Sequence, residues 1–564
     1  MKYLNFFNEH FIKKEKFRTI ILLFLMLIGM VLETFSIGAL VPLFSAFSDP
    51  NNFKDYSFFS QLSQREIIIY LTLGIFIVFS SKTIFMLVLS RMQANFSYSI
   101  MARISSTLFR FYSLPEYNLS SEKDTSETIR NIIREPSFLV GGILLPLFTI
   151  LTEVFIIFGI IVLLLIFSPS ATLYVLSFIV ITTIILLRYT RPKLDGLGKE
   201  VQKYESKRIK QVTYSLSGAK DFVLVNLKEV FFNFFNSYTK SATSNLAKQA
   251  FYKQITRTLL EFFSIIAICG LILFLLTTGT NPSKILSLIG IYLVALFRIL
   301  PAANKIIINL NTLSFNNASL QLIGIELNKL KDFKKTTKRI KQENKIIKNW
   351  NKISLEKINF SYPNEKDYIF KEFNLKINRN DFCMISGPSG SGKSTLVDII
   401  LGILKPSSGK LITSNNEKDF HGFCIDKDEL AYVPQKTFLL DESILANIAL
   451  QDYFEGNIDF NRIKKATQVA CLDNFIGSLE NGINHEVGEG GIALSGGQIQ
   501  RIGIARALYR NPKLLILDES TSALDRNNED NIMKNLLNFE DITLICISHS
   551  ENILKYSSKV IKIG

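Results

Sequence analysis

The sequence predicts a membrane domain of six α-helical spans followed by a soluble α/β domain. Hydrophobic residues make up 48% of the 564 residues, and the mean hydropathy of +0.24 is high for a soluble protein. These apolar residues gather in six segments of about 20 residues, the length that an α-helix needs to cross a bilayer. From Asn351 onward, short β-rich runs alternate with helical stretches, as in soluble α/β domains. We therefore predict a membrane domain at 1–325, a basic linker at 326–350 and an α/β domain at 351–564.

The connections between the spans indicate their orientation. The apolar segments lie at 19–44, 66–90, 138–166, 171–190, 259–278 and 283–306. The long connections 91–137 and 191–258 are rich in Lys and Arg, and we expect helical extensions there. The short connections that are poor in these residues are 45–65, 167–170 and 279–282. By the positive-inside rule, the N-terminus, both long connections and the α/β domain are cytoplasmic. The first apolar segment is too long for a signal peptide.

The formal net charge of +15 is compatible with either nucleic acid or an anionic membrane surface as a partner. The six spans indicate that the positive charge serves a membrane surface, so we predict no nucleic-acid partner. The five cysteines form neither a CxxC pair nor a zinc-ligand cluster with histidine, and we interpret them as reduced, mostly buried thiols. They are Cys269, Cys383, Cys424, Cys471 and Cys546.

The segment GPSGSGKST follows the apolar strand sequence FCMIS and fits the pattern GxxxxGK[ST] between a strand and a helix. Its residues are Gly387, Pro388, Ser389, Gly390, Ser391, Gly392, Lys393, Ser394 and Thr395. The glycines allow backbone N–H groups to surround phosphates at a helix N-terminus. We expect Lys393 to reach the β- and γ-phosphates and Ser394 to bind Mg²⁺. The segment therefore predicts an ATP site.

The segment KLLILDE places two carboxylates at the end of a buried strand. Such a pattern is common in α/β proteins, but downstream of a phosphate loop it becomes specific. We expect Asp518 to hold Mg²⁺, directly or through water, and Glu519 to polarise the attacking water.

Together with LSGGQ at 494–498, these motifs resemble the nucleotide-binding domain of ABC transporters, and six preceding spans resemble the exporter half-transporter layout. The resemblance implies nucleotide contacts from Tyr362 (adenine stacking), Gln435 (also near Mg²⁺), Ser495, Gly496, Gly497, Gln498, Asp525 and His549 (γ-phosphate). The implied catalytic residues are Glu519, His549 and Lys393. The sequence departs from the family pattern at Ile499 and Ser550, which remove no catalytic atom.

The chain carries one phosphate loop and one LSGGQ segment. In the family, each loop works against the signature of the opposite subunit, so the resemblance implies a homodimer with two composite ATP sites. A heterodimer with a related chain remains open. By the same resemblance, the coupling helices fall at 114–121 and 215–221.

Cations inside the predicted spans are candidate contacts for the transported substrate, or cargo. They are Lys82, Arg257, Arg298 and Lys305. Arg298, Ala302, Lys305 and Asn309 follow helical spacing on one face, and the predicted topology places the cations at similar depths in the inner half of the bilayer. Charges inside spans usually line a cavity. The alternatives are snorkelling to the inner headgroups, or ion pairs with Glu33, Glu153 or Glu261.

Such cations suit an anionic headgroup, and arginine suits phosphate or pyrophosphate. The segment ALFRILPAANKII also resembles the last span of bacterial flippases for lipid-linked oligosaccharides. This resemblance implies an ATP-driven translocase for a polyprenyl-pyrophosphate-linked glycan in the bacterial inner membrane. The aromatic segment 47–62 is either an interfacial element near the lipid tail or an ordinary aromatic belt.

Two alternatives stay open at this stage. The first is an exporter of another amphiphile, such as a lipid A-like lipid, a peptide or a drug. The absence of a peptidase-like domain before the first span disfavours a bacteriocin exporter. The second is a regulatory or channel-like membrane protein that ATP binding gates without pumping. Intact Glu519 and His549 argue against this second alternative.

Overall fold

The computed structural model describes residues 13–43, 63–114, 125–218, 224–225, 227–277, 282–341, 350–362, 367–413, 416–419, 427–539 and 541–563. The predicted coupling helices lie partly, and Cys424 and the aromatic segment 47–62 entirely, outside these residues. The chain divides into two compact units, Met1–Asp332 and Phe333–Gly564, which are described separately.

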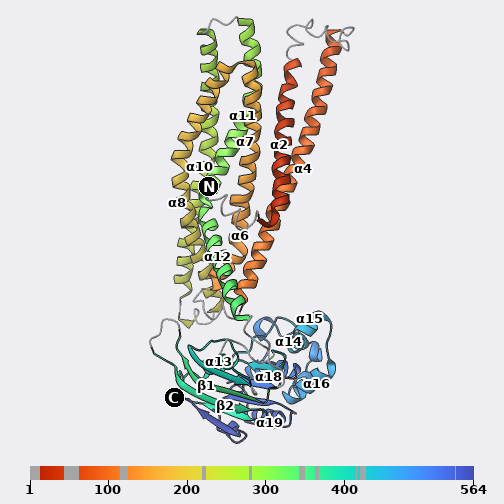
Figure 1. Cartoon of the computed structure of the whole chain (residues 1–564), viewed down its shortest axis with the longest axis vertical. Coiled ribbons are helices and arrows are strands. Elements are labelled where there is room, and N and C mark those ends of the chain that lie inside the picture. Colours follow the sequence, from red (N-terminus) through yellow and green to blue (C-terminus); the bar gives the residue numbers. More distant parts are fainter. Residues whose placement is uncertain are drawn as a thin grey trace. The chain divides into compact units, whose positions relative to one another are not determined.

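The first unit consists of long helices (Figure 1). Their bounds are α2 Lys13–Gly38, α4 Gln64–Tyr112, α6 Thr125–Leu139, α7 Leu145–Phe167, α8 Pro169–Ser217, α10 Lys228–Thr277, α11 Pro282–Phe315 and α12 Asn317–Lys341. Six helical segments among the described residues are long and apolar enough to cross a membrane. They coincide with the six spans predicted from the sequence, which confirms that part of the fold.

The long basic connections are largely continuations of the spans. Helices α4, α8 and α10 contain 49, 49 and 50 residues. At a rise of about 1.5 Å per residue, each measures roughly 75 Å, more than twice the thickness of the hydrocarbon core. A capping box starts α4: the Ser63 hydroxyl accepts from the backbone N–H of Glu66, whose carboxylate accepts from the backbone N–H of Ser63.

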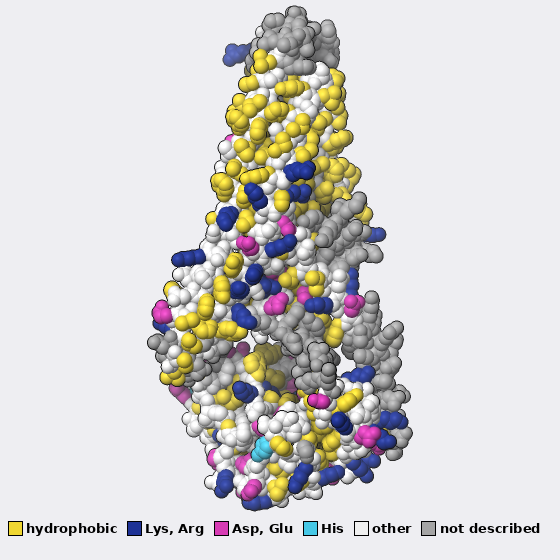
Figure 2. All heavy atoms as spheres, turned by 90° about the vertical axis from the view of Figure 1, so that its left-hand side faces the viewer, with side chains coloured by type: hydrophobic (Ala, Val, Ile, Leu, Met, Phe, Trp, Pro, Cys, Tyr) yellow, Lys and Arg dark blue, Asp and Glu magenta, His cyan; other side chains and the backbone are white. Residues whose placement is uncertain are grey.

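Apolar side chains separate into a buried set and a set that faces outward. The core of the span region joins α7, α8, α10 and α11 through Ile156, Ile160, Val175, Leu271, Tyr292 and Leu296. In Figure 2 apolar side chains cover the upper part of the helical unit. Exposed apolar side chains of α8 and α10 include Ile181, Ile184, Phe262 and Ile265. An apolar exterior over a packed interior is what helices need in lipid.

Two glycines allow neighbouring helices to pack closely against the junction between α11 and α12. A π-helical turn at Val140–Leu144 joins α6 to α7, and a Cβ at Gly142 would lie 2.3 Å from Cγ of Asn316. On α8, a Cβ at Gly198 would lie 1.9 Å from the carbonyl oxygen of Phe315. Both contacts meet the junction between α11 and α12, so the glycines allow α7 and α8 to pack closely against it.

We expect Gly198→Ala to destabilise the protein by about 1–3 kcal/mol, because the added methyl group meets a backbone carbonyl that cannot rotate away. Gly196→Ala is a matched control on the same helix, since a Cβ there has no neighbour within 4 Å. Better helix propensity should stabilise that variant by about 0.5–1 kcal/mol. Thermal unfolding of the purified variants measures both effects; equal melting temperatures would contradict the close contact.

The second unit is an α/β domain with two sheets. Its strands are β1 Lys352–Phe360, β2 Phe370–Asn378, β3 Phe382–Ser386, β4 Ser408–Thr413, β5 Asn416–Asp419, β6 Leu430–Val433, β7 Leu514–Asp518, β8 Thr543–Ile547 and β9 Lys559–Lys562. An antiparallel sheet has the order β2-β1-β4-β5, and a parallel sheet has the order β6-β7-β8-β3-β9. The described helices are α13 Lys393–Ile400, α14 Ile444–Ala449, α15 Gln451–Glu455, α16 Phe460–Val469, α17 Asp473–Gly477, α18 Gly496–Tyr509, α19 Arg526–Leu537 and α20 Glu551–Leu554.

The parallel sheet positions the predicted ATP residues. Strands β7 and β8 are buried along their whole length, which fits their continuous apolar sequences. Because β3, β7 and β8 run parallel as neighbours, their carboxyl ends meet at one edge. The phosphate loop, the two carboxylates at 518–519 and the predicted histidine at 549 follow these ends. The topology therefore brings three separate motifs to one edge of the sheet.

Candidate functional site

The phosphate loop connects β3 to α13 through backbone shapes that need glycine. A Cβ at Gly387 would lie 2.1 Å from the carbonyl oxygen of Ile563. Gly392 precedes α13 with a φ of +94°, in the left-handed region. Lys393 is buried, and its Nζ donates to the carbonyl oxygens of Gly387 and Pro388, each at 2.9 Å. The lysine ammonium therefore lies against the loop that is predicted to surround the phosphates.

Tyr362, the predicted adenine-stacking residue, lies next to this loop. Its hydroxyl is 3.1 Å from Oγ1 of Thr395 on α13, and its ring packs edge-on against Phe360. About a third of the tyrosine is exposed. The ring is thus held at the phosphate-loop helix with one part accessible; stacking on adenine stays a prediction.

Asp518 ends β7 in a buried, negatively charged setting. Burial raises the pKa of its carboxyl group above the usual range, and the neighbouring charge of Glu519 adds to this effect. The hydroxyl of Tyr432 donates to Oδ2 of Asp518 at 3.0 Å and opposes the rise. Burial, together with the charge of Asp518, also raises the pKa of Asp398 on α13 to about 6. A buried carboxyl group, Asp518, and a partly buried one, Asp398, are therefore close enough beside the phosphate loop to influence each other, an arrangement that a cation would stabilise.

Glu519 is the point at which three predicted motifs converge. Nε2 of Gln435 donates to Oε2 of Glu519 at 2.7 Å, and Nε2 of His549 lies 3.7 Å from its Oε1. The backbone φ of Glu519 is +47°, which is uncommon for a residue other than glycine. Residues held in this region cost of order 1–3 kcal/mol and cluster at functional sites. The predicted catalytic carboxylate is thus oriented from both sides on a strained backbone.

The LSGGQ segment begins α18. Ser495 is the N-cap: its hydroxyl accepts from the backbone N–H of Gln498, and its own N–H donates to Oε1 of Gln498 at 2.7 Å. Gln500 then binds the following loop, donating to Ser522 at 3.3 Å and accepting from the N–H of Ala523 at 3.0 Å. Among the described residues, no hydrogen bond or ion pair joins the 495–498 segment to the phosphate loop.

The two departures from the family pattern have structural explanations. Ile499 is partly buried against the larger apolar core of the α/β domain, so an apolar residue fits there. The hydroxyl of Ser550 donates to Oε2 of Glu529 on α19 at 3.0 Å. Asp525, the predicted nucleotide contact, caps the same helix by accepting from the N–H of Asn528 at 2.9 Å. Helix α19 therefore links the segments that carry Asp525 and His549.

Sequence reasoning missed two residues of this region. Tyr432 orients Asp518, and Gln500 connects the signature helix to the 522–525 loop. The signals were weak: Tyr432 lies three residues before Gln435 on an otherwise apolar strand, and Gln500 looks like a surface residue of a helix. Both are polar side chains whose partners are distant in sequence.

In the membrane-spanning unit, three of the predicted cations form a charge cluster with two carboxylates. We define the charge cluster as Lys82 of α4, Arg298 and Lys305 of α11, Glu33 of α2 and Glu153 of α7. Oε1 of Glu33 lies 3.2 Å from Nζ of Lys82 and 2.5 Å from Nε of Arg298. The two oxygens of Glu153 contact Nη1 of Arg298 at 3.2 Å and Nζ of Lys305 at 2.7 Å. The cluster connects four helices.

The members of the charge cluster differ in accessibility. The carboxylates are 4% exposed at Glu33 and 5% at Glu153, whereas Arg298 is 21% and Lys305 53% exposed. Since Lys82 and Arg298 share one oxygen, they lie at one level, as the topology predicted. Ala302, predicted to share the cavity face with these cations, is instead fully buried, because the chain packs closely there.

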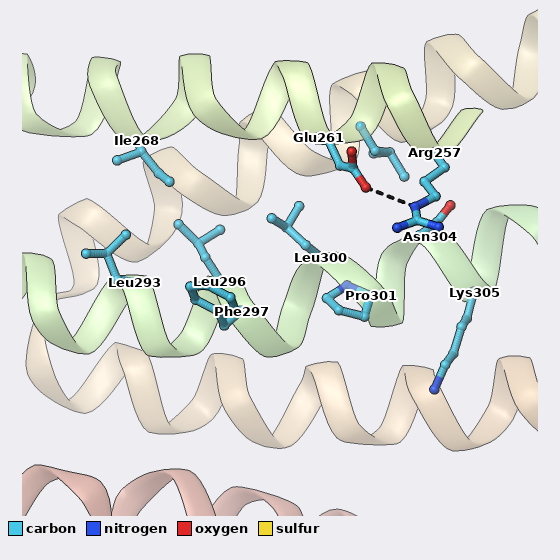
Figure 3. Close-up of a pocket in the computed structure, with 11 residues that line it drawn as sticks. Arg257, Glu261, Ile268, Leu293, Leu296, Phe297, Leu300, Pro301, Asn304 and Lys305 are labelled. Atoms are coloured by element: carbon cyan, nitrogen blue, oxygen red, sulfur yellow. Dashed lines mark hydrogen bonds and ion pairs between the residues drawn. The ribbon is translucent and has the colours of Figure 1, made fainter. Parts of the chain in front are cut away.

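Arg257 does not belong to the charge cluster. It pairs with Glu261 one helical turn away at 3.0 Å, with both side chains 60% exposed. The two line one end of a cavity of about 410 Å³ between α10 and α11, together with Asn304 and Lys305. Its other walls are apolar: Leu260, Ile268, Leu293, Leu296, Phe297, Leu300 and Pro301. Figure 3 shows Arg257 and Asn304 at one end, while Lys305 extends to the opposite side of α11.

Comparison with known families decides the identity of this architecture. Residues 17–300, half of the chain, match the family described as the ABC transporter transmembrane region, and residues 370–522 match the ABC transporter domain. The chain belongs to the ABC transporter family. It is a multi-pass membrane protein of the half-transporter type, with a membrane domain and an ATP-binding domain fused in one chain.

A solved structure agrees with this assignment across both units of the transporter. A bacterial Atm1-family ABC exporter with ATP bound matches with a TM-score of 0.75 over 97% of this chain and 94% of that chain. The sequences are 18% identical, so the likeness establishes the fold alone. It confirms the predicted exporter type of six spans followed by a nucleotide-binding domain.

Curated relatives share higher identity over shorter regions. ABC transporter B family member 13 of Arabidopsis thaliana is 37% identical over 211 residues, or 37% of this chain. The alpha-hemolysin translocation ATP-binding protein HlyB of Escherichia coli O157:H7 is 34% identical over 243 residues, or 43% of this chain. The transporter spans 17% and 34% of the lengths of these two relatives.

The residues of the transporter's nucleotide site fit ATP with Mg²⁺. Ser394 is exposed at the start of α13, and Asp518 is a buried carboxylate whose pKa is raised mainly by burial. Among the described residues, no three His, Cys, Asp or Glu side chains group as metal ligands. Magnesium typically binds one or two carboxylates and completes its shell with phosphate oxygens and water, which matches this donor set.

We expect Tyr432→Phe to raise the Mg²⁺ concentration needed for half-maximal ATPase activity by about two- to tenfold, since one hydrogen bond to Asp518 is lost. That hydrogen bond lowers the pKa of Asp518, so its loss raises this pKa further and favours protonation. The defect should therefore be larger at pH 6 than at pH 8. Tyr453→Phe is the control. A Mg²⁺ requirement independent of pH would contradict the assigned role.

Proposed function

We propose that this chain is an ATP-driven flippase that acts as a homodimer in the bacterial inner membrane. Its cargo would be a polyprenyl-pyrophosphate-linked oligosaccharide or a similar anionic glycolipid, moved from the inner to the outer leaflet. The observation that carries the choice of cargo is the charge cluster, in which Lys82, Arg298 and Lys305 outnumber the two carboxylates and leave one net positive charge inside the membrane-spanning unit.

ATP hydrolysis is supported by the arrangement around Glu519. In this proposal, Glu519 accepts a proton from the attacking water, while Gln435 and His549 hold its carboxylate in place. Lys393 would stabilise the negative charge that develops on the phosphates, and Ser394 and Asp518 would hold Mg²⁺, which would supply positive charge at the phosphate oxygens. A second copy supplies Ser495 and Gly497 to each site. This accounts for a signature segment that makes no hydrogen bond or ion pair with the phosphate loop of its own chain among the described residues.

An amphiphilic cargo is supported by the cavity between α10 and α11. Its long apolar wall suits hydrocarbon, and its polar end presents Asn304 and Arg257, which pairs with Glu261 (Figure 3). The side-chain oxygen of Asn304 is buried without a hydrogen-bond partner, so a ligand with a hydroxyl or amide donor would satisfy it. A glycolipid combines the three required features: hydrocarbon, negative charge and hydrogen-bond donors.

Export of a polypeptide is the second candidate. Its support is the similarity to proteins named for translocation of alpha-hemolysin and leukotoxin. The charge cluster favours the lipid, because its net positive charge lies at one place in the spans and suits a compact anion better than an extended chain of mixed charge.

The test combines identification of bound lipid with transport. The purified transporter, extracted with native lipid, is analysed by lipid mass spectrometry, and the lipids found are tested for stimulation of ATPase activity and for flipping in proteoliposomes. We expect enrichment of a pyrophosphate-linked glycolipid and ATP-dependent movement of it. Enrichment of peptides, or ATPase activity without movement of any lipid, would overturn the proposal.

A further inference from the structure

Glu33 and Glu153 have no place in the ATP site, and the proposed flippase activity assigns them no role. Each is almost fully buried, on α2 and α7 respectively, and each contacts two cations of the charge cluster. Helix α2 packs against both α4 and α7, and α7 also packs against α11. The carboxylates therefore neutralise cations that α4 and α11 bring to the interior of this helix packing.

The charge cluster keeps unused binding capacity on its accessible side. Its three cations and two carboxylates leave one net positive charge. Arg298 uses Nε and Nη1 on the carboxylates, and among the described residues its Nη2 has no hydrogen-bond or ion-pair partner. Oε2 of Glu153 meets Arg298 as an ion pair but accepts no hydrogen bond. The pairing of Glu153 with Arg298 is thus the weaker contact, and an external anion can compete for this arginine.

We propose that Glu33 and Glu153 are specificity-determining residues, acting as internal counter-anions that compete with the cargo for Arg298, Lys82 and Lys305. This inference rests on the proposed anionic cargo. A lipid with one negative charge gains little at a cluster that is already almost neutral. A pyrophosphate diester carries two negative charges and can displace a carboxylate from Arg298 through bidentate hydrogen bonds. The carboxylates therefore exclude the monoanionic phospholipids that surround the protein.

The same competition has a consequence for release. When the cargo leaves, the carboxylates return to their cations, so no buried cation is left unpaired. Removing the carboxylates should therefore tighten binding and slow turnover together. A purely structural role for Glu33 and Glu153 would change stability without changing the preference between lipids.

The experiment compares the intact transporter with Glu33→Gln, Glu153→Gln and the double variant in nanodiscs. The probes are undecaprenyl pyrophosphate and phosphatidylglycerol, added in titrations that follow ATPase stimulation and bound lipid. We expect the double variant to bind phosphatidylglycerol at least about tenfold more tightly, because net charge rises from one to three. For undecaprenyl pyrophosphate, KM and kcat should both fall. Glu153→Asp, which keeps the charge, should restore the wild-type preference.

Glu205→Gln is the matched control, because Glu205 is also a buried carboxylate between two arginines, Arg134 and Arg208, outside the charge cluster. If the folded Glu33→Gln and Glu153→Gln variants keep the wild-type lipid preference, the counter-anion inference is wrong. The proposed cargo is not affected by that result. Should the wild type fail to bind undecaprenyl pyrophosphate while the double variant gains phosphatidylglycerol, the proposed cargo would be wrong and the counter-anion role would stand. Variants that do not fold are replaced by Glu33→Asp and Glu153→Asp, whose retained charge predicts unchanged preference; a changed preference would overturn the inference.

Discussion

Glu519→Gln is expected to lower ATP hydrolysis by at least about 100-fold, the usual contribution of a general base. The amide cannot accept a proton from the attacking water, but it keeps the size of the carboxylate and can still meet Gln435 and His549. ATP binding should remain within about twofold of wild type, because removing a negative charge near the phosphates does not weaken their attraction. Steady-state phosphate release and nucleotide binding to the purified protein measure the two quantities.

The control for this variant is Glu480→Gln, an exposed glutamate elsewhere in the same domain. It should hydrolyse ATP at the wild-type rate. Undiminished turnover in Glu519→Gln would remove Glu519 from its assigned role. Loss of both binding and hydrolysis would instead indicate that the strained backbone at Glu519, with its φ of +47°, does not tolerate the substitution.

The ATP site could be predicted from sequence to a large extent because its motifs are contiguous. The phosphate loop needs glycines at fixed spacing, and the strand before Asp518 is apolar along its length. How the side chains of the site are oriented could not be predicted from the sequence. The hydrogen bond from Tyr432 to Asp518 and the contacts of Gln500 depend on how strands and helices pack, and no local pattern specifies them.

In the membrane-spanning unit, the spans could be predicted from the sequence, but the partners of the cations could not. Its spans follow directly from hydropathy, since backbone groups in lipid must be satisfied within helices. The environment of the cations does not, because helical spacing fixes which face carries Arg298 but not which neighbour meets that face. Glu33 and Glu153 were possible partners among several, and Arg257 pairs with Glu261 instead of joining the others. The partners depend on contacts between helices far apart in sequence.

Arg298→Ala is expected to reduce flipping of a pyrophosphate-linked lipid by about 10- to 100-fold, the effect of losing hydrogen bonds to a charged group. Arg298 is the cluster member that contacts both carboxylates and also keeps an unused nitrogen. After its removal Glu33 retains Lys82 and Glu153 retains Lys305, so each buried carboxylate keeps a cation and the fold should persist.

ATP hydrolysis without lipid should change little in this variant, while its stimulation by the lipid should disappear, since Arg298 lies in the membrane-spanning unit and the nucleotide residues lie in the other. Arg188→Ala, which removes an exposed arginine from α8, is the control and should transport at the wild-type rate. Flipping and ATPase assays on the same proteoliposomes separate the two effects. Equal flipping in wild type and Arg298→Ala would exclude Arg298 from the path of the cargo. Loss of lipid-free hydrolysis would show that the charge cluster acts on the nucleotide-binding domain, independently of the lipid.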